Sequence, residues 1–183
     1  MPIGNQFIEG SLHSPNIGNY YVGKGIISLK LLGESVFTDC GNVPVFEFQA
    51  KVTNLDHYSS RQGVRIKDFV AVIEISGSLT MQLEELTARN VGFALLGLAS
   101  GGPSPTPDTI TVLSSPIIYG AVKFTGTNDI GPIWTVDFPL VKLAPSKALG
   151  LIQNTWGVID LEGDVLYDQV SQGFGTATVT QPA

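Results

Sequence analysis

The side chains from which most metal and catalytic sites are built are scarce in this sequence. Its two histidines, His13 and His57, are far apart and match neither HxxxH nor HExxH spacing, the patterns that place two imidazoles on one metal. Cys40 is the sole cysteine, so the usual ligands cannot complete a zinc site and no intramolecular disulfide can form. We therefore expect no metal and no other cofactor, and we interpret His57 as a contact residue.

The alternating acids Asp160, Glu162 and Asp164 are a second candidate for chemistry. On one face of a strand they could bind a hard cation such as Ca²⁺, or act as a general acid and base. No glycine-turned loop of Asp and Asn ligands surrounds them. We therefore interpret the acids as a solvated or channel-facing strand edge.

Motifs for nucleophilic catalysis and for phosphate binding are absent from the sequence. It contains no G-x-S-x-G nucleophile elbow, no GxxxxGKS/T and no G-x-G-x-x-G. Basic residues are few and dispersed, and Trp134 and Phe138 share one strand face, which favours a core position over a base-stacking platform. We therefore expect a protein that is not an enzyme.

The composition indicates a surface that other protein covers. Of 183 residues, 43% are hydrophobic and only 14% are charged, whereas about a quarter is usual in soluble domains. A large core under a Ser/Thr/Gly surface is the alternative. No apolar stretch approaches the roughly 20 residues of a membrane helix, so we expect no membrane contact. The net charge of −6 disfavours a protein that grips nucleic acid, but it allows DNA to slide past.

Hydrophobic patterns predict a mainly β protein. Alternation is clearest at 66–82, which predicts a long strand of roughly 50 Å whose apolar face we expect to be core. A helical stripe with acids in its first turn predicts one helix over 83–96. Further strands are expected at 25–32, 43–53, 109–124, 132–143, 155–168 and 173–180.

Irregular and polar segments separate these elements. Residues 1–22 are interpreted as an N-terminal docking arm, followed by a single β-sandwich domain over 23–183. A polar loop is predicted at 54–65, longer than the 2–5 residues usual in hairpins, and such loops often contact a partner. Gly and Pro predict another loop at 98–108. The expected fold class is mainly β: a β-sandwich or barrel of about seven strands with one flanking α-helix.

Four segments occur in a characteristic order: 19–25 (NYYVGKG), 55–68 (LDHYSSRQGVRIKD), the helix over 83–96, and 156–166 (WGVIDLEGDVL). Together they resemble the major tail tube proteins of bacteriophages, and the central stretch carries most of the likeness. Related tube proteins occur in contractile tails, gene transfer agents and type VI secretion systems.

The resemblance implies a ring-forming fold in which six subunits join their inner sheets into a continuous β-barrel around a channel. Stacked rings form a tube that encloses the tape measure protein and later conducts DNA without specific binding. The tail terminator and distal tail proteins are further implied partners. The implied location is the virion tail, assembled in the host cytoplasm; the N-terminus, which lacks a signal peptide pattern, agrees with folding in a cytoplasm.

The resemblance also implies roles for particular regions. The N-terminal arm and the 101–107 loop would touch neighbouring subunits. The 54–65 loop would touch the next ring, through Asp56, His57, Tyr58, Ser59, Ser60 and Arg61. The polar face of the two strands that flank this loop would line the channel, through Glu47, Gln49, Asp68, Glu74, Ser76, Ser78 and Thr80.

Two other functions stay open at this point. A monomeric carbohydrate- or receptor-binding β-sandwich would need exposed aromatic side chains clustered on loops, where Tyr58 is the main candidate. A β-fold hydrolase would need His57 or His13 to meet an acid such as Asp160 or Glu162.

Overall fold

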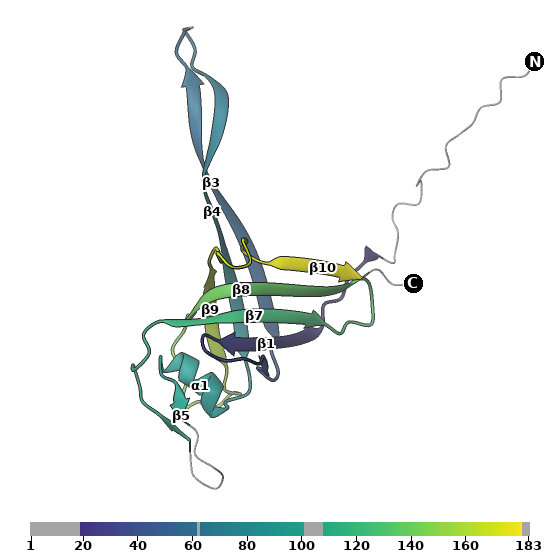
Figure 1. Cartoon of the computed structure of the whole chain (residues 1–183), viewed down its shortest axis with the longest axis vertical. Coiled ribbons are helices and arrows are strands. Elements are labelled where there is room, and N and C mark those ends of the chain that lie inside the picture. Colours follow the sequence, from purple (N-terminus) through teal and green to yellow (C-terminus); the bar gives the residue numbers. More distant parts are fainter. Residues whose placement is uncertain (1–18, 62, 101–107, 181–183) are drawn as a thin grey trace, which may run out of the picture.

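The computed structural model describes residues 19–61, 63–100 and 108–180. In this part of the chain the main feature is an antiparallel eight-stranded sheet, ordered β2-β1-β7-β8-β9-β4-β3 with β10 beside β8, accompanied by a short β5-β6 pair and the helix α1 (Figure 1). The expected mainly β fold with one helix is confirmed. The elements are β1 (Gly25–Leu31), β2 (Thr38–Asp39), β3 (Val45–Ser59), β4 (Ile66–Leu83), α1 (Ala88–Ala94), β5 (Ala99–Ser100), β6 (Thr109–Ile110), β7 (Ile118–Gly126), β8 (Ile133–Pro145), β9 (Ile159–Val165) and β10 (Thr176–Thr180).

The strongly bent sheet packs against itself around one apolar core. Leu79, Met81 and Leu83 of β4 are fully buried, and they belong to the same cluster as Ile27 and Leu29 of β1. In β1, β9 and the last part of β4, alternate residues point into this cluster, as in a β-sandwich. Each fully buried side chain of this kind contributes roughly 1.5–3 kcal/mol relative to leaving it in water.

Aromatic pairs close the side of the core where the edge strand β3 returns towards β7 and β8. Phe46 stacks on Phe124 with ring centroids 5.9 Å apart, and Phe48 tilts against Phe138 at 5.1 Å. β3 is hydrogen-bonded to neither β7 nor β8, so side-chain packing alone closes the fold here. Phe138 is buried, as expected, whereas Trp134 is half-buried.

The long strand predicted at 66–82 is confirmed as β4, but the expectation that its whole apolar face is core is wrong. Leu79 and Met81 are buried, while Phe69 is 64% exposed and Ile73 and Ile75 are exposed. The reason is that β9 pairs with β4 only from Gly77 to Leu83. Beyond that point, no described part of the chain forms a second layer over either face of the strand.

The loop predicted at 54–65 is also wrong, because most of it is strand. β3 continues to Ser59 and β4 begins at Ile66, and the two stay paired to their ends. The polar residues that indicated a loop lie in a ribbon whose two faces are both open to solvent, where polarity does not distinguish strand from loop. Only 60–65 connects the strands.

The helix predicted over 83–96 is shorter than expected. Leu83 pairs with Ile159 in the sheet, so the chain cannot turn helical before it leaves β4. The N-cap is Thr87, whose Oγ1 accepts a hydrogen bond from the N–H of Asn90 at 3.2 Å. α1 ends at Ala94 and Leu96 takes the left-handed conformation, with φ 48°.

Three remaining segments differ from the sequence prediction. Part of the loop expected at 98–108 forms the β5-β6 pair, and 101–107 lies outside the described residues. The strand expected at 109–124 divides into β6 and β7 around Pro116, which cannot donate to a sheet. The strand expected at 155–168 is only β9, which leaves Trp156 in a loop. Most of the N-terminal arm, 1–18, lies outside the described residues. No helix in the described ranges is long and apolar enough to cross a membrane.

Candidate assembly surface

The polar sides of β3 and β4 form one continuous surface. The register places Glu47 opposite Thr80 and Gln49 opposite Ser78, on the face opposite the buried Leu79. Six of the seven residues expected to share this face do so, since Ser76 and Glu74 continue it along β4. That the face lines a channel stays a prediction.

β9 extends this polar face with the acids that the sequence presented as a separate group. Asp164 lies opposite Ser78, Glu162 opposite Thr80, and Asp160 opposite Gln82. Sequence reasoning missed this because alternation within a strand does not reveal its neighbour. One signal in the sequence could have indicated it: β4 and β9 both alternate polar and apolar residues. Each strand must therefore turn its polar side away from the core, and paired strands then share one polar surface.

Ion pairs neutralise part of the charge on this surface, which we call the polar face (β3, β4, β9 and the end of β8). Lys142 Nζ lies 3.7 Å from Asp164 Oδ2, and Lys147 Nζ 3.1 Å from Asp160 Oδ1. Gln82 Nε2 donates to the same Asp160 oxygen at 2.7 Å. Acids remain in excess, with Glu47, Glu74, Asp160, Glu162 and Asp164 against Lys51, Lys142 and Lys147.

Asp68 is separated from the rest of the expected channel set. It is the extra residue of a bulge, because His57 pairs with Phe69 while Tyr58 pairs with Lys67. Its Oδ1 lies 2.6 Å from Nδ1 of His57. The structure therefore places Asp68 beside His57, one of the residues expected to contact the next ring, rather than beside the other six.

A two-stranded ribbon projects from the body, and we call it the arm: 54–59 of β3, the turn 60–65, and 66–76 of β4 (Figure 1). At about 3.3 Å per residue the β4 portion extends roughly 35 Å. Each strand of the arm has a single neighbour in the described structure. Its exposed apolar side chains are Leu55, Tyr58, Val64, Ile66, Phe69, Val70, Val72, Ile73 and Ile75.

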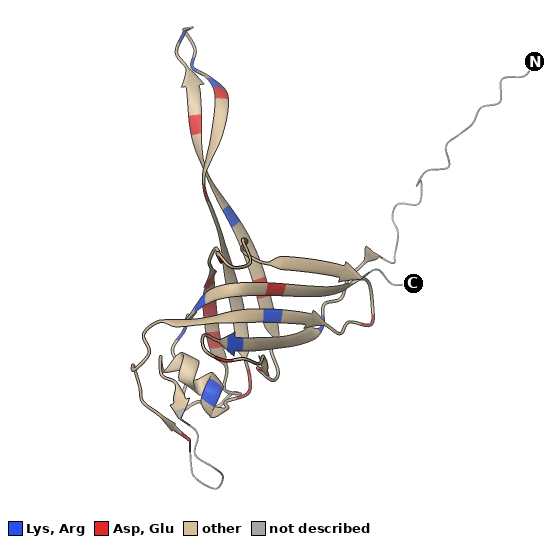
Figure 2. Ribbon diagram, viewed as in Figure 1, with Lys and Arg blue, Asp and Glu red and all other residues tan. Residues whose placement is uncertain are grey.

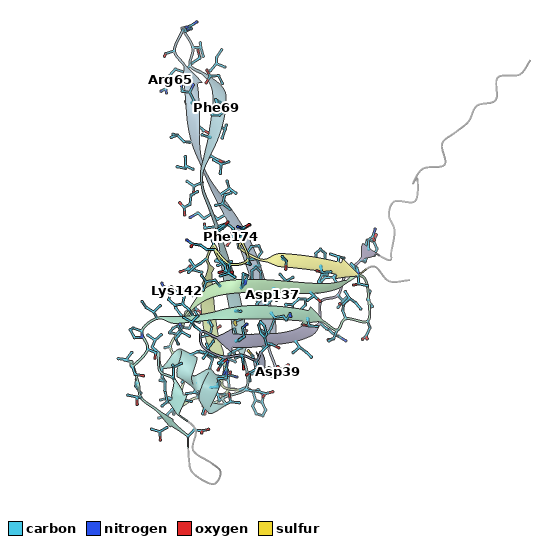
Figure 3. All side chains as sticks on the ribbon, in the orientation of Figure 1. Asp39, Arg65, Phe69, Asp137, Lys142 and Phe174 are labelled. Carbon is cyan, nitrogen blue, oxygen red and sulfur yellow. The ribbon has the colours of Figure 1, made fainter. Side chains whose placement is uncertain are left out.

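The six residues expected to contact the next ring lie in the distal half of the arm and its turn. Lys67 Nζ lies 2.7 Å from Asp56 Oδ1, and the Arg65 guanidinium stacks 4.9 Å from the Tyr58 ring centroid. With the His57–Asp68 contact, these interactions join the two strands of the arm. The polar groups are thus largely paired within the arm, whereas its apolar side chains remain exposed (Figure 3).

An apolar groove opens beside the edge of β3, with a volume of about 590 Å³. Tyr21, Phe46, Phe124 and Trp134 line it, and Lys24 is the one charged residue in its wall. Among the described residues, no His, Asp, Glu, Ser or Cys side chain lines it. His57 lies on the arm, and His13 lies outside the described residues.

A polar network holds α1 against β1 and the turn that follows it. Arg89 makes two hydrogen bonds to the Glu34 carboxylate, at 2.5 and 2.8 Å, and a third to the carbonyl of Leu29. The Arg89 hydrogen bond holds the pKa of Glu34 below its ordinary value. Burial raises the pKa of the nearby Cys40 thiol to about 12, which makes it a structural rather than a reactive cysteine.

In the described part of the chain, no group of three or more His, Cys, Asp and Glu residues could hold a metal ion.

No curated protein matches the chain. A family model described as "Protein of unknown function UCP028589" matches residues 20–122, from the segment before β1 into β7. Since the match covers more than half of the 183 residues, the chain belongs to this family.

Proposed function

We propose that this protein is the structural subunit of the tail tube of a bacteriophage or a phage-like particle. Six copies form a ring, and stacked rings form a hollow tube that encloses the tape measure protein and conducts DNA. The tube is part of the virion tail, is assembled in the host cytoplasm, and ends at the tail terminator and distal tail proteins. The protein acts by assembly and not by catalysis.

The observation that carries this proposal is the incomplete β3–β4 ribbon. A two-stranded ribbon with both faces in water is marginally stable, and an exposed apolar surface indicates a binding partner. Among the described strands, β3 has a partner on one side only, so its other edge along Val45–Ser59 is unpaired and is a template for another strand. Copies of the same chain that close a ring would remove that edge.

The polar face supports the second half of the proposal. Its acids exceed its lysines, so it repels phosphate instead of neutralising it. The core lies on the opposite side of the same strands. A ring that turns the polar face inward would therefore have a wet, acidic bore that DNA can pass without binding.

The first test is assembly of the purified protein. Sedimentation across a concentration series and negative-stain electron microscopy should show rings and hollow tubes. A species that stays monomeric at every concentration and salt would contradict the proposal.

An arm-shortened variant separates ring formation from stacking. Replacing 56–70 with an Asn-Gly turn joins the pair Leu55 and Ala71 through a connection that suits a hairpin. Because the core residues are untouched, the body should fold and form rings at most, without tubes. Tubes as long as those of the unmodified protein would contradict a stacking role for the arm.

The aromatic groove favours one second candidate, a monomeric carbohydrate- or receptor-binding module. Tyr21 and Trp134 in a wall of apolar side chains offer stacking surfaces of the kind that binding sites use. A specific hit on a glycan array, lost in Trp134→Ala and given by a monomer, would support this candidate over the tube.

A further inference from the structure

A second apolar surface lies at the end of the molecule opposite the arm. Ile152 is 99% exposed, Trp156 91% and Leu151 81%, all in the loop between β8 and β9. Leu86, also exposed, comes to the same place, since the backbone of Gly157 lies against its side chain. We call these four residues, with the acids Asp39, Glu84 and Glu85, the base surface.

The positions of the two surfaces follow from the register of β4. Its first residue, Ile66, is at the distal end of the arm. Its last residue, Leu83, pairs with Ile159, just after the Trp156 loop. Arm and base surface therefore occupy opposite ends of one strand, and every copy of the chain carries both.

Charge distinguishes the two ends as clearly as position does. The turn of the arm carries Arg61 and Arg65 and no acid. At the base surface, Glu84 and Glu85 are bound by Asn42, whose side-chain and backbone N–H groups donate to them at 2.5 and 3.1 Å. A neutral partner leaves both charges uncompensated. Figure 2 shows the basic tip of the arm, and Figure 3 labels Arg65 near this tip and Asp39 at the opposite end of the body.

We infer that the arm of one copy docks on the base surface of a second copy. Arg61 and Arg65 face Glu84 and Glu85, while the apolar side chains of the arm cover Trp156 and Ile152. The inference rests on the proposed function, because it names the surface that receives the arm. Such a contact is heterologous: each copy uses its arm on one neighbour and its base surface on another, so the contact propagates along an axis.

The occupant is a second copy because the two surfaces match in both respects that guide association. Both expose large apolar side chains, whose burial drives binding. Their uncompensated charges are opposite, which steers encounter and fixes orientation. Two arms cannot dock on each other in this way, because both turns are basic, and two base surfaces are both acidic.

A charge-swap experiment tests the inference directly. The variant R61E/R65E has an acidic arm and an acidic base surface, and the variant E84R/E85R is basic at both ends. Each alone should associate at least roughly tenfold more weakly than the unmodified protein, the effect of about 1.4 kcal/mol. An equimolar mixture should recover association, since each arm then meets a base surface of opposite charge.

Tryptophan fluorescence can report docking of the arm in a variant that keeps both the arm and the base surface unchanged. Trp134→Phe leaves Trp156 as the sole tryptophan, because the chain contains two. Its emission should move to shorter wavelength as concentration rises, as the exposed indole leaves water. Trp156→Ser and Ile152→Ser should weaken association, whereas Val170→Ser, at a side chain 93% exposed in the loop between β9 and β10, should not.

The outcomes separate this inference from the proposed function. If tubes form but Trp156 emission stays constant and the mixed variants do not recover, the inference is overturned and the tube remains. If the mixture recovers association while microscopy shows neither rings nor tubes, the docking contact stands and the tube proposal fails. A shift of Trp156 emission that requires a different protein would also overturn the inference.

Discussion

At the scale of single residues, the fold depends on a few polar groups that are completely paired. The bidentate contact of Arg89 with Glu34 joins α1 to the turn after β1, and the same guanidinium also reaches a carbonyl of β1. A planar guanidinium suits this geometry, which an ammonium group cannot reproduce.

The Arg89–Glu34 contact predicts a pH-dependent stability. Because the folded-state pKa of Glu34 is lowered, its contribution is complete above the ordinary pKa of about 4.3 and is lost as pH falls through the lowered value. Glu34→Gln should lower the free energy of unfolding by about 1 kcal/mol at neutral pH. The difference from the unmodified protein should be smaller at pH 3 than at neutral pH, in urea titrations at both pH values.

The matched control for that prediction is Glu162→Gln. Glu162 is an exposed acid of β9 whose carboxylate has no hydrogen bond or ion pair among the described residues, so its replacement should change stability little at either pH. A Glu34→Gln penalty that persists unchanged at pH 3 would contradict an electrostatic origin.

Cys40 should be chemically silent in the folded protein. It is 2% exposed and its thiol pKa is raised to about 12 by burial, so neither access nor thiolate is available at pH 8. A thiol reagent should label it only at the rate of global unfolding, and promptly in urea. Val36→Cys, at an exposed position, should label at once. Rapid labelling of Cys40 in the native protein would contradict the buried position.

At the scale of elements, the sequence predicted strands where burial imposes a pattern and misjudged those where it does not. β1 and the core half of β4 were predicted to within about a residue or two, because one face of each meets the core. The arm obeys no such pattern. Leu55 and Phe69 are exposed and Asn54 and Asp56 lie within a strand, so polarity wrongly predicted a loop.

Pairing between distant strands was the other part that the sequence could not predict. The acids of β9 alternate clearly, yet nothing within their strand indicates that they lie beside Ser78 and Thr80. The same pairing explains the short helix, because Leu83 is held in the sheet by Ile159. The same pairing explains why Trp156 lies in a loop and not in the predicted strand. β4 ends at Leu83, which pairs with Ile159, so β4 does not extend beside the residues that precede Ile159.

The short helix α1 depends on the buried amide of Asn90. Its Nδ2 donates to the carbonyls of Cys40 and Glu85, at 3.0 and 2.8 Å. Asn90→Asp keeps the size, removes both donors and buries a carboxylate against two carbonyl oxygens. We expect a loss of about 3 kcal/mol or more in chemical denaturation.

The control for Asn90 is Asn154→Asp, the same change at an exposed position of the Trp156 loop. It should alter stability by no more than about 0.5 kcal/mol. If the two variants were equally stable, the hydrogen bonds of Asn90 would not hold α1.

At the scale of the whole molecule, three surfaces of the subunit are incomplete. The β3 edge lacks hydrogen-bond partners among the described strands, and the arm and the base surface expose apolar side chains. The polar face, by contrast, consists of side chains that water can solvate. A second protein strand can pair with an exposed edge, and protein can bury an apolar patch. An acidic polar surface, in contrast, is well solvated by water. This division is what a ring with a wet bore requires, and it makes the polar face the place where charge can be changed without disturbing assembly.

If the polar face lines the bore of the proposed tube, reversing its charge should make that bore retain DNA. Glu162 and Asp164 are exposed, and the Lys142–Asp164 pair is weak at 3.7 Å, so E162K/D164K should fold and assemble. Each added lysine that meets a phosphate steepens the salt dependence of binding by a slope of about 0.9 for duplex DNA. Tubes of this variant should retain labelled DNA at low salt and release it at high salt. The neutral variant E162Q/D164N should retain little, as should the unmodified protein. Lysine tubes that assemble normally yet retain no more DNA than the neutral tubes would show that the polar face does not line the path of DNA.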